Sequence, residues 1–476
     1  MGGACEGRVD GRRVAVRPVE RDVAGRLLAL RVRPFVGIGA YTSTFSAIFA
    51  TNNTKNCLSS VYAIPAIQID VKMVLTNTAP LGPYRGAGRP EAFMLIERLL
   101  DGAARATGID RVDLRRRNFI APSAMPYRAV TGQVYDSGDF AAVLDKALAL
   151  ADWKSFPARR AAAERAGRLR GIGLCCFLEV AGGILDETVD LRFEADGTVA
   201  VRTGVQAMGQ GHLSTYPRLI AAQLGVDVGA VRLIEGDSDV VPAGTPSVAS
   251  RSLMIAGSAM ALACDSAIDK GRRLAADLFE AAPFDVEFSD GRFRVKGTDR
   301  VIGILDLARQ AAGALDTTAK FVSPQMTFPN GCHITEIELE PETGALRVVG
   351  YAAVDDVGRL AHPIIVEGQI HGGVAQGLGQ VLGEHVVYDG SGQLLTASFM
   401  DYLLPRAADL PALRVDHHVV PCTTNPLGVK GAGESGVAGA LPSAINAVLD
   451  ALATRGVTHL DLPMTPARVW GALTGR

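Results

Sequence analysis

The segment Gly428–Gly436, GVKGAGESG, constrains this chain most, because it leaves the backbone bare around one carboxylate. Four glycines in nine residues frame Glu434, and a helical pattern follows directly. Glycine permits positive φ and lets another group approach the main chain closely. The segment therefore predicts either a bulky ligand lying against the backbone with one base aimed at it, or a glycine-rich turn whose glutamate caps the helix.

The same segment satisfies G-x-G-x-x-G at Gly431, Gly433 and Gly436. A dinucleotide-binding fingerprint requires a strand immediately before the first glycine. Here the nearest strand-like run, 413–420, ends too early, and prolines interrupt the approach. An NAD-binding oxidoreductase is therefore a minor alternative, in which Asp450 would be the acid that binds the ribose.

Composition and charge bound the class of protein. A chain of 476 residues predicts two or three domains, and 48% hydrophobic with 21% charged residues is typical of a soluble globular protein. The net charge of −2 gives no electrostatic case for nucleic acid or an anionic membrane. Seven cysteines without C-x-x-C spacing indicate buried thiols in a reducing compartment. With no membrane-length apolar stretch and no signal-peptide core, a cytoplasmic protein is expected.

Hydrophobic periodicity predicts strands and helices joined by glycine loops. Helices are expected at 91–107, 139–153, 251–280, 363–381 and 438–453. Hairpins are expected at 187–203, 284–295, 334–354 and around Asp389-Gly390, and a strand, turn and strand at 24–40. The expected fold class is therefore α/β, with mixed sheets and helices in layers. Neighbouring Cys175 and Cys176 should point to opposite faces of one strand.

Five glycine- and glutamine-rich loops remain once common catalytic motifs are excluded. No Walker A, H-E-x-x-H, EF-hand or G-x-S-x-G motif occurs, and the eight histidines are scattered, so no protein metal site is predicted. The loops read PYRGAGRPEA (83–92), GQGH (209–212), GTPSVASRS (244–252), QIHGGVAQGLGQ (369–380) and GVKGAGESG (428–436). One such loop is usually an ordinary turn, but five together favour a large polar ligand with a phosphate-bearing tail.

In these five motifs and their order, the chain resembles the molybdopterin-binding large subunit of the xanthine dehydrogenase and aldehyde oxidase family of molybdenum hydroxylases. The resemblance runs from about Leu28 to near the C-terminus and implies two elongated domains of mixed sheets and helices that grip the cofactor between them. The expected division is an atypical N-terminal segment (1–27), a partial first molybdopterin-binding domain (28–153), a linker (154–172) and a second molybdopterin-binding domain (173–476). The similarity is closest in style to bacterial subunits, including carbon monoxide dehydrogenase large chains.

The resemblance also implies a reaction, the hydroxylation of an aldehyde or N-heterocycle with water as the oxygen source. Glu434 would be the general base, with a pKa tuned for that work, and Arg85 would stabilise negative charge on the substrate. Electrons would leave through a [2Fe-2S] iron–sulfur subunit and an FAD subunit. The remaining site residues would bind molybdenum-molybdopterin cytosine dinucleotide: Gly209, Gln210, Gly211, Ser250, Arg251, Ser252, Gln376, Gly377, Lys430, Gly431 and Gly433.

Two departures from the family pattern narrow these expectations. Carbon monoxide dehydrogenases carry a cysteine in the loop that begins at the equivalent of Tyr84-Arg85, where this chain has Gly86-Ala87-Gly88, so oxidation of carbon monoxide is not expected. Family subunits also extend upstream of Leu28 with two further cofactor loops, so a separate chain could supply a missing N-terminal half. The rival interpretation is a catalytically silent remnant or binding module.

Overall fold

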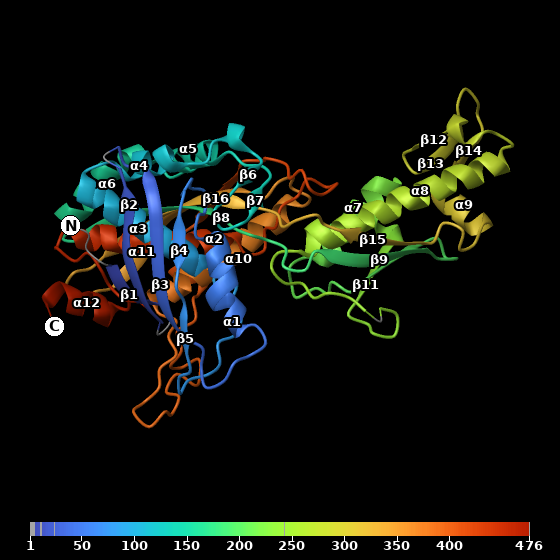
Figure 1. Cartoon of the computed structure of the whole chain (residues 1–476). Helices are drawn as coiled ribbons and strands as arrows, with labels where there is room; N and C mark the ends of the chain where they lie inside the picture. Colours follow the sequence, from blue (N-terminus) through green and yellow to red (C-terminus); the bar gives the residue numbers. More distant parts are fainter. Residues whose placement is uncertain (1–4, 10–11, 23, 242, 476) are drawn as a thin grey trace.

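The chain folds into two lobes, each with its own hydrophobic core (Figure 1). The computed structural model describes residues 5–9, 12–22, 24–241 and 243–475. The core of the larger lobe draws on residues 27–180 and 328–469, whereas that of the smaller lobe draws on 189–315. The smaller lobe is thus one continuous insertion into the larger. The boundaries between these two cores lie elsewhere than the linker expected at residues 154–172. The expected division into molybdopterin-binding domains stays a prediction.

The larger lobe contains two main sheets. The first has the order β1-β2-β3-β4, with β5 also pairing β3: β1 (Cys5–Val9), β2 (Arg12–Arg21), β3 (Leu27–Gly37), β4 (Ile67–Ile69) and β5 (Lys72–Val74). The second, central sheet has the order β18-β17-β16-β8: β8 (Leu169–Leu178), β16 (Asn330–Leu339), β17 (Leu346–Asp356) and β18 (Leu413–His417). In the central sheet β18 runs parallel to β17, and the other neighbours are antiparallel. A short pair consists of β6 (Tyr127–Arg128) and β7 (Val134–Tyr135).

Twelve helices complete the described part of the chain, together with short 3-10 and π-helical turns. Those of the larger lobe are α1 (Ser46–Ile48), α2 (Thr54–Cys57), α3 (Arg89–Thr107), α4 (Arg111–Asn118), α5 (Phe140–Leu150), α6 (Phe156–Arg165), α10 (Pro363–Leu382), α11 (Ser435–Ala453) and α12 (Pro466–Thr474). Those of the smaller lobe are α7 (His212–Leu224), α8 (Ser258–Leu278) and α9 (Ile304–Gln310).

The smaller lobe is built on a sheet with the order β11-β10-β9-β15, at the right of Figure 1. Its strands are β9 (Asp186–Phe193), β10 (Val199–Thr203), β11 (Val231–Glu235) and β15 (Thr317–Val322). Helix α8 contacts β9 and β15, and a π-helical turn, Leu253–Gly257, leads into it. A second sheet has the order β12-β13-β14: β12 (Val286–Ser289), β13 (Arg292–Val295) and β14 (Val301–Gly303).

Helix α11 is the central element of the larger lobe, where it packs against β8, β16, α3 and α10. Its close approach to β8 depends on Gly171 and Gly173, which occupy alternate positions on the strand. A Cβ atom at either glycine would lie closer than 3.0 Å to backbone atoms of α11, a distance that real Cβ atoms essentially never show. Among the described helices α11 alone is long and apolar enough to cross a membrane, but 89% of its apolar window is buried inside the protein. It is therefore a core helix. The sequence suggested no apolar stretch as long as a membrane span, but α11 is one.

The glycines of QIHGGVAQGLGQ likewise allow the backbone of α10 to approach α11 closely. A Cβ atom at Gly373 would lie 2.8 Å from Gly436 Cα, and one at Gly377 would lie 2.7 Å from Ala440 Cβ. The segment is therefore part of a helix that packs on α11, and Gly377 lies in that helix contact.

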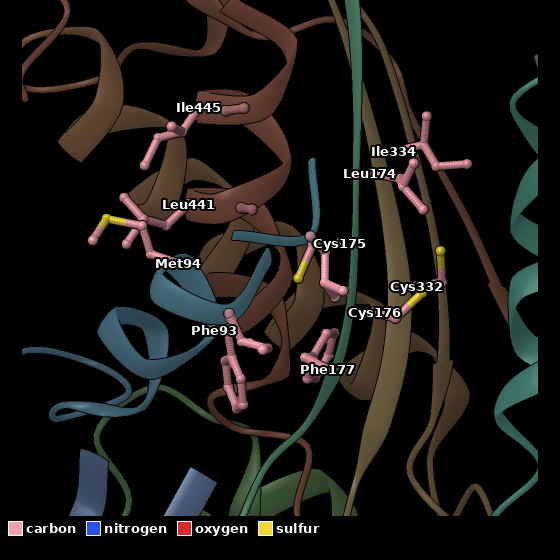
Figure 2. Close-up of a cluster of buried hydrophobic side chains, with 14 of the residues drawn as sticks. Phe93, Met94, Leu174, Cys175, Cys176, Phe177, Cys332, Ile334, Leu441 and Ile445 are labelled. Atoms are coloured by element: carbon pink, nitrogen blue, oxygen red, sulfur yellow. The ribbon is translucent and has the colours of Figure 1, made fainter. Parts of the chain in front are cut away.

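Cys175 and Cys176 lie on opposite faces of β8, as the strand periodicity predicts. Figure 2 shows Cys175 directed toward α3 and α11, and its Sγ lies 4.0 Å from the carbonyl oxygen of Ala438. Cys176 is the register partner of Cys332 on β16. The six cysteines whose side chains are described are all buried and free of disulfide bonds.

Three expected elements differ from the structure. Residues 24–40 contain a single strand, β3 (Leu27–Gly37), whose burial alternates along its length and which pairs with β2. Around Asp389-Gly390 the expected hairpin contains no strand ladder but an isolated bridge between Tyr388 and Leu394, and the Asp389 carboxylate accepts hydrogen bonds from the backbone N–H groups of Ser391 and Gln393 in the turn. The last long helix begins at Ser435 rather than 438, so Glu434 occupies its N-cap position.

Candidate active site

Glu434 stands at the start of α11, but within the described structure its side chain makes no cap hydrogen bond to that helix. Its Oε1 accepts a hydrogen bond from the backbone N–H of Gly86 at 3.0 Å. Its Oε2 accepts one from the guanidinium of Arg89 at 3.1 Å and one from the hydroxyl of Ser250 at 3.0 Å. The helix-cap interpretation is therefore wrong. The carboxylate instead joins three loops that are far apart in the sequence.

Two charged residues beside Glu434 were not predicted from the sequence. Arg89 is the buried first residue of α3, where a cation opposes the helix dipole, and this unfavourable placement is the signal that could have identified it. Glu179 directly follows β8, is fully buried, and has its Oε1 4.0 Å from Nη1 of Arg89. Its signal is that it is the one acid in the apolar run GIGLCCFLEV.

The two carboxyl groups have opposite pKa shifts. Burial raises the pKa of Glu434, but the charge of Arg89, the neighbouring Glu179 side chain and the hydrogen bonds from Gly86 and Ser250 outweigh burial, so the pKa lies below its ordinary value. Burial raises the pKa of Glu179 well above its ordinary value, and the charge on Glu434 raises it further. Glu434 is therefore the ionised member of the pair at neutral pH, and it is hydrogen-bonded rather than bare.

Arg85 links the loop before α3 to two other segments. Its Nε donates to the carbonyl oxygen of Gly433 at 2.5 Å, and Nη1 donates to the side chain of Gln376 at 3.1 Å. Its Nη2 donates to the carbonyl oxygen and the side-chain oxygen of Gln369, at 2.9 and 3.0 Å. All four acceptors are neutral, and the described residues offer Arg85 no ion pair. Gln376 thus orients Arg85, and the positive charge of the guanidinium is not neutralised by direct contact.

A cavity of about 120 Å³ lies beside this network. It is lined by the starts of α7, of the π-helical turn before α8, of α10, and by the loop that leads into α11. None of the three helix starts has a side-chain cap within the described residues. The unpaired N–H groups of helix N-termini bind anions, phosphate above all. The cavity therefore fits the anionic part of a larger ligand.

Five of the expected cofactor-binding residues line this cavity: Gln210, Ser250, Ser252, Lys430 and Gly433. The N-cap of α7 is Gly211, and Gly209 and Gly211 flank Gln210 with φ of +95° and +83°. Gly431 lies under the loop of Ser250, where a Cβ atom would be 2.6 Å from Ala181 Cβ. Ala249 and Ser250 themselves have φ of +50° and +56°, uncommon values for residues with side chains, and this strained turn presents the Ser250 hydroxyl to Glu434.

Three expected binding residues have other partners in the structure. The guanidinium of Arg251 is buried and donates to Glu187 at 3.1 Å and to the carbonyl oxygens of Ile184 and Asp186. Lys430 is buried in an ion pair with Asp356 at 2.6 Å, although it also borders the cavity. Gly377 lies in the α10–α11 contact described above. Arg251 and Gly377 therefore shape the loops around the cavity, because their own surfaces are already covered by protein.

The structure offers little support for the NAD alternative. Strand β18 ends at His417, well before Gly431. The carboxylate of Asp450 already binds Arg111, Arg160 and the backbone N–H of Ile172, so it is not available to a ribose. Among the described residues no group of three or more His, Cys, Asp or Glu is placed to hold a metal ion.

Known proteins show strong similarity to this chain. Residues 146–411 match a molybdopterin cofactor-binding domain family, and residues 19–119 match a second family of the same description. The carbon monoxide dehydrogenase large chain of Hydrogenophaga pseudoflava is 36% identical over 475 residues, covering 94% of this chain and 59% of the relative. The nicotine 6-hydroxylase large subunit of Paenarthrobacter nicotinovorans is 31% identical, covering 95% of this chain and 58% of the relative.

A solved structure, quinoline 2-oxidoreductase from Pseudomonas putida 86, has the same fold. It superposes with a TM-score of 0.92 at 31% identity, covering 98% of this chain and 62% of that one. The chain thus spans about three fifths of the length of the relatives that it matches.

Proposed function

Because this chain belongs to the molybdopterin-binding large subunits of the xanthine dehydrogenase family, we propose that it forms the catalytic part of a molybdenum hydroxylase. The reaction is oxidation of an aldehyde or N-heterocycle with water as the oxygen source. One observation carries the proposal: an ionised Glu434 follows a loop that lines a cavity together with three helix starts, and Arg85 donates a hydrogen bond to that same loop. Two relatives are named for N-heterocycles, nicotine and quinoline, which favours that substrate class.

The cofactor is molybdenum-molybdopterin cytosine dinucleotide, which when bound supplies the redox chemistry at the carbon centre. The uncapped start of α7 at Gly209–Gly211 and the segment Ser250–Ser252 provide N–H and hydroxyl groups for its phosphates. Gln210 adds a neutral amide at the cavity wall, Gly433 lines the cavity without a side chain, and Gly431 allows the loop to pack closely on Ser250. Because these groups come from both lobes, a large phosphate-bearing ligand can contact all of them, whereas a small anion cannot.

Glu434 acts as the general base on the water-derived nucleophile. A base must be ionised before it can accept a proton, and the hydrogen bonds from Gly86, Arg89 and Ser250 keep the carboxylate ionised and fixed in direction. Arg85 stabilises negative charge that develops on the substrate, because neutral acceptors hold its guanidinium without neutralising it.

Carbon monoxide is not the proposed substrate, although the matched relatives include carbon monoxide dehydrogenases. The loop that follows Arg85 has φ of +94°, +46° and +92° at Gly86, Ala87 and Gly88. A Cβ atom at Gly88 would clash with the backbone carbonyl of Phe49, so the loop is closed against its neighbour and contains no sulfur. It has no counterpart of the cysteine expected for oxidation of carbon monoxide.

The proposed partners are a [2Fe-2S] iron–sulfur subunit and an FAD subunit, which would carry electrons away from the site. Relatives named as large chains or as a complex subunit support an assembly of several chains. Coverage of only 59% of the relative leaves room for a separate chain that supplies the remaining part of the molybdenum subunit. The proposed location is the cytoplasm.

The decisive experiment measures molybdenum by mass spectrometry in the purified protein, expressed with and without any adjacent chain that carries the remaining part. Near-stoichiometric molybdenum, with cytosine nucleotide released on denaturation, supports the proposal. Turnover is then tested with aldehydes and N-heterocycles in ¹⁸O-labelled water with an artificial electron acceptor. Glu434→Gln should keep its molybdenum but lose about 10²- to 10⁴-fold in turnover, the contribution typical of a general base. Glu342→Gln, at an exposed turn, is the control. Absence of molybdenum from both preparations would overturn the proposal.

A further inference from the structure

Glu179 is a buried carboxyl group to which the proposed function gives no task. Its side chain has no exposed surface, and it faces Arg89 and Glu434. Neither of its oxygens accepts a hydrogen bond from an N–H or hydroxyl group among the described residues. Its nearest cation, Nη1 of Arg89, is 4.0 Å away. An ionised carboxylate without a donor is strongly disfavoured in such a place.

A protonated Glu179 removes this difficulty. Its O–H becomes a donor, and the carboxylate of Glu434, which lies on the same Nη1 atom of Arg89, is an acceptor on that side. Two buried carboxyl groups that share one guanidinium nitrogen do not both ionise, because like charges repel in a buried site. Arg89 lies 3.1 Å from Glu434 but 4.0 Å from Glu179, so the negative charge belongs on Glu434 and the proton on Glu179.

The other titratable groups nearby agree with this division. Arg85, on the loop before α3, adds a second positive charge that acts on both carboxyl groups. Cys57 of α2 is a neutral thiol, because burial raises its pKa to about 12. Glu91 on α3 acts on Arg89. The pair therefore carries one negative charge that faces Arg89, with one proton to share.

We propose that Glu179 is a positioning residue for the general base: as a carboxylic acid it donates a hydrogen bond to Glu434 and holds that carboxylate ionised and oriented toward the cavity. The proton stays on Glu179, and no covalent bond changes. The proposal rests on the proposed role of Glu434 in the reaction, but the protonation of Glu179 itself does not depend on that role.

Infrared spectroscopy tests the protonation without any turnover. The spectrum of the wild-type protein at neutral pH, minus that of Glu179→Gln, should contain the carbonyl stretch of an un-ionised carboxylic acid, shifted in D₂O. Glu342→Gln should give no such band. If Glu179→Gln does not fold, protein labelled with ¹³C-glutamate should keep an acid carbonyl band to well above neutral pH, both in the wild type and in Glu97→Gln, which removes the other buried glutamate whose pKa burial raises. An ionised Glu179, seen as a carboxylate band lost in the variant, would overturn the proposal whether or not the protein holds molybdenum.

The pH profile of turnover tests the positioning role. Glu179→Gln keeps a neutral donor, so the acid limb of kcat/KM should stay in place, even if the maximum falls. Glu179→Leu removes the donor, and the acid limb should move upward by roughly one to two pH units, the shift expected when a carboxylate loses one hydrogen bond to a charged group. A downward shift in both variants would mean that Glu179 is an ionised neighbour, and would overturn the proposal. A wild-type protein without turnover would contradict the proposed function and leave the infrared result to decide the state of Glu179.

Discussion

Replacing Gly173 by alanine should destabilise the larger lobe by about 3 kcal/mol, near the upper end of the usual cost of overpacking. The added Cβ would lie closer than 3.0 Å to three atoms of the α11 backbone, in Ser443, Asn446 and Ala447. Ordinary contact begins at about 3.4 Å, so strand and helix must separate. Backbone atoms cannot rotate away as a flexible side chain can. The helix is also held from its other side, where Gly373 packs on Gly436.

Urea denaturation followed by tryptophan fluorescence measures this effect in the relevant lobe. The chain has two tryptophans, and Trp153 packs on the core of the larger lobe while Trp470 lies on α12 of the same lobe. The midpoint should fall with little change in slope. Gly350→Ala in β17 is the matched control, because its Cβ would meet the Glu336 Cβ at an ordinary 3.5 Å. Equal midpoints for the two variants would refute the argument that close backbone contact holds β8 on α11.

Three further predictions concern buried charges and thiols. Arg251→Met should lower the free energy of unfolding by about 3–5 kcal/mol, because it leaves the buried Glu187 without its ion-pair partner. The control, Arg192→Met, breaks a partly exposed pair with Asp190 and should cost under about 1 kcal/mol. Similar melting temperatures for the two variants would contradict this reasoning. Cys57, with its pKa raised to about 12 by burial, should resist alkylation at pH 8 until the protein unfolds, and mass spectrometry of labelled native protein checks this. The pKa of the Glu434 carboxyl is lowered from its ordinary value of 4.5. The ionised carboxylate therefore stabilises the fold at pH values above 4.5, and this stabilisation is lost as the pH falls through the lowered pKa. The difference in unfolding free energy between the wild type and Glu434→Gln should therefore shrink as pH falls below about 5, and a difference independent of pH would exclude this account.

Local patterns in the sequence predicted much of the fold. The hairpin at 187–203 pairs Val199 with Phe193 and Val201 with Leu191, as the alternation of apolar residues predicts. Helix α5 begins after Asp139, whose carboxylate accepts a hydrogen bond from Ala142 N–H as an N-cap. Such signals lie within a few residues of one another, so a single sequence contains them.

Contacts across the chain were harder to predict. Arg89 and Glu434 are 345 positions apart, and no local pattern shows that they meet. Glycines were ambiguous for a different reason: Gly377 in a helix contact and Gly209 in an open loop look the same in the sequence, because the absence of a side chain serves close packing and ligand approach equally. Only the neighbour that approaches each glycine separates the two roles.

The position of α11 in the sequence has a consequence for biosynthesis. Strand β8 and α11 meet through contacts such as that of Cys175 with Ala438, which are 263 positions apart, so the ribosome makes the strand long before the helix that covers it. The core at 189–315 is complete in the interval. A nascent chain therefore carries a finished smaller lobe beside an open larger one, whose apolar β8 face needs protection from aggregation until residues 435–453 emerge. Glu434 arrives with that helix, so its hydrogen bonds to Gly86, Arg89 and Ser250 form only after the last fifth of the chain has begun to emerge.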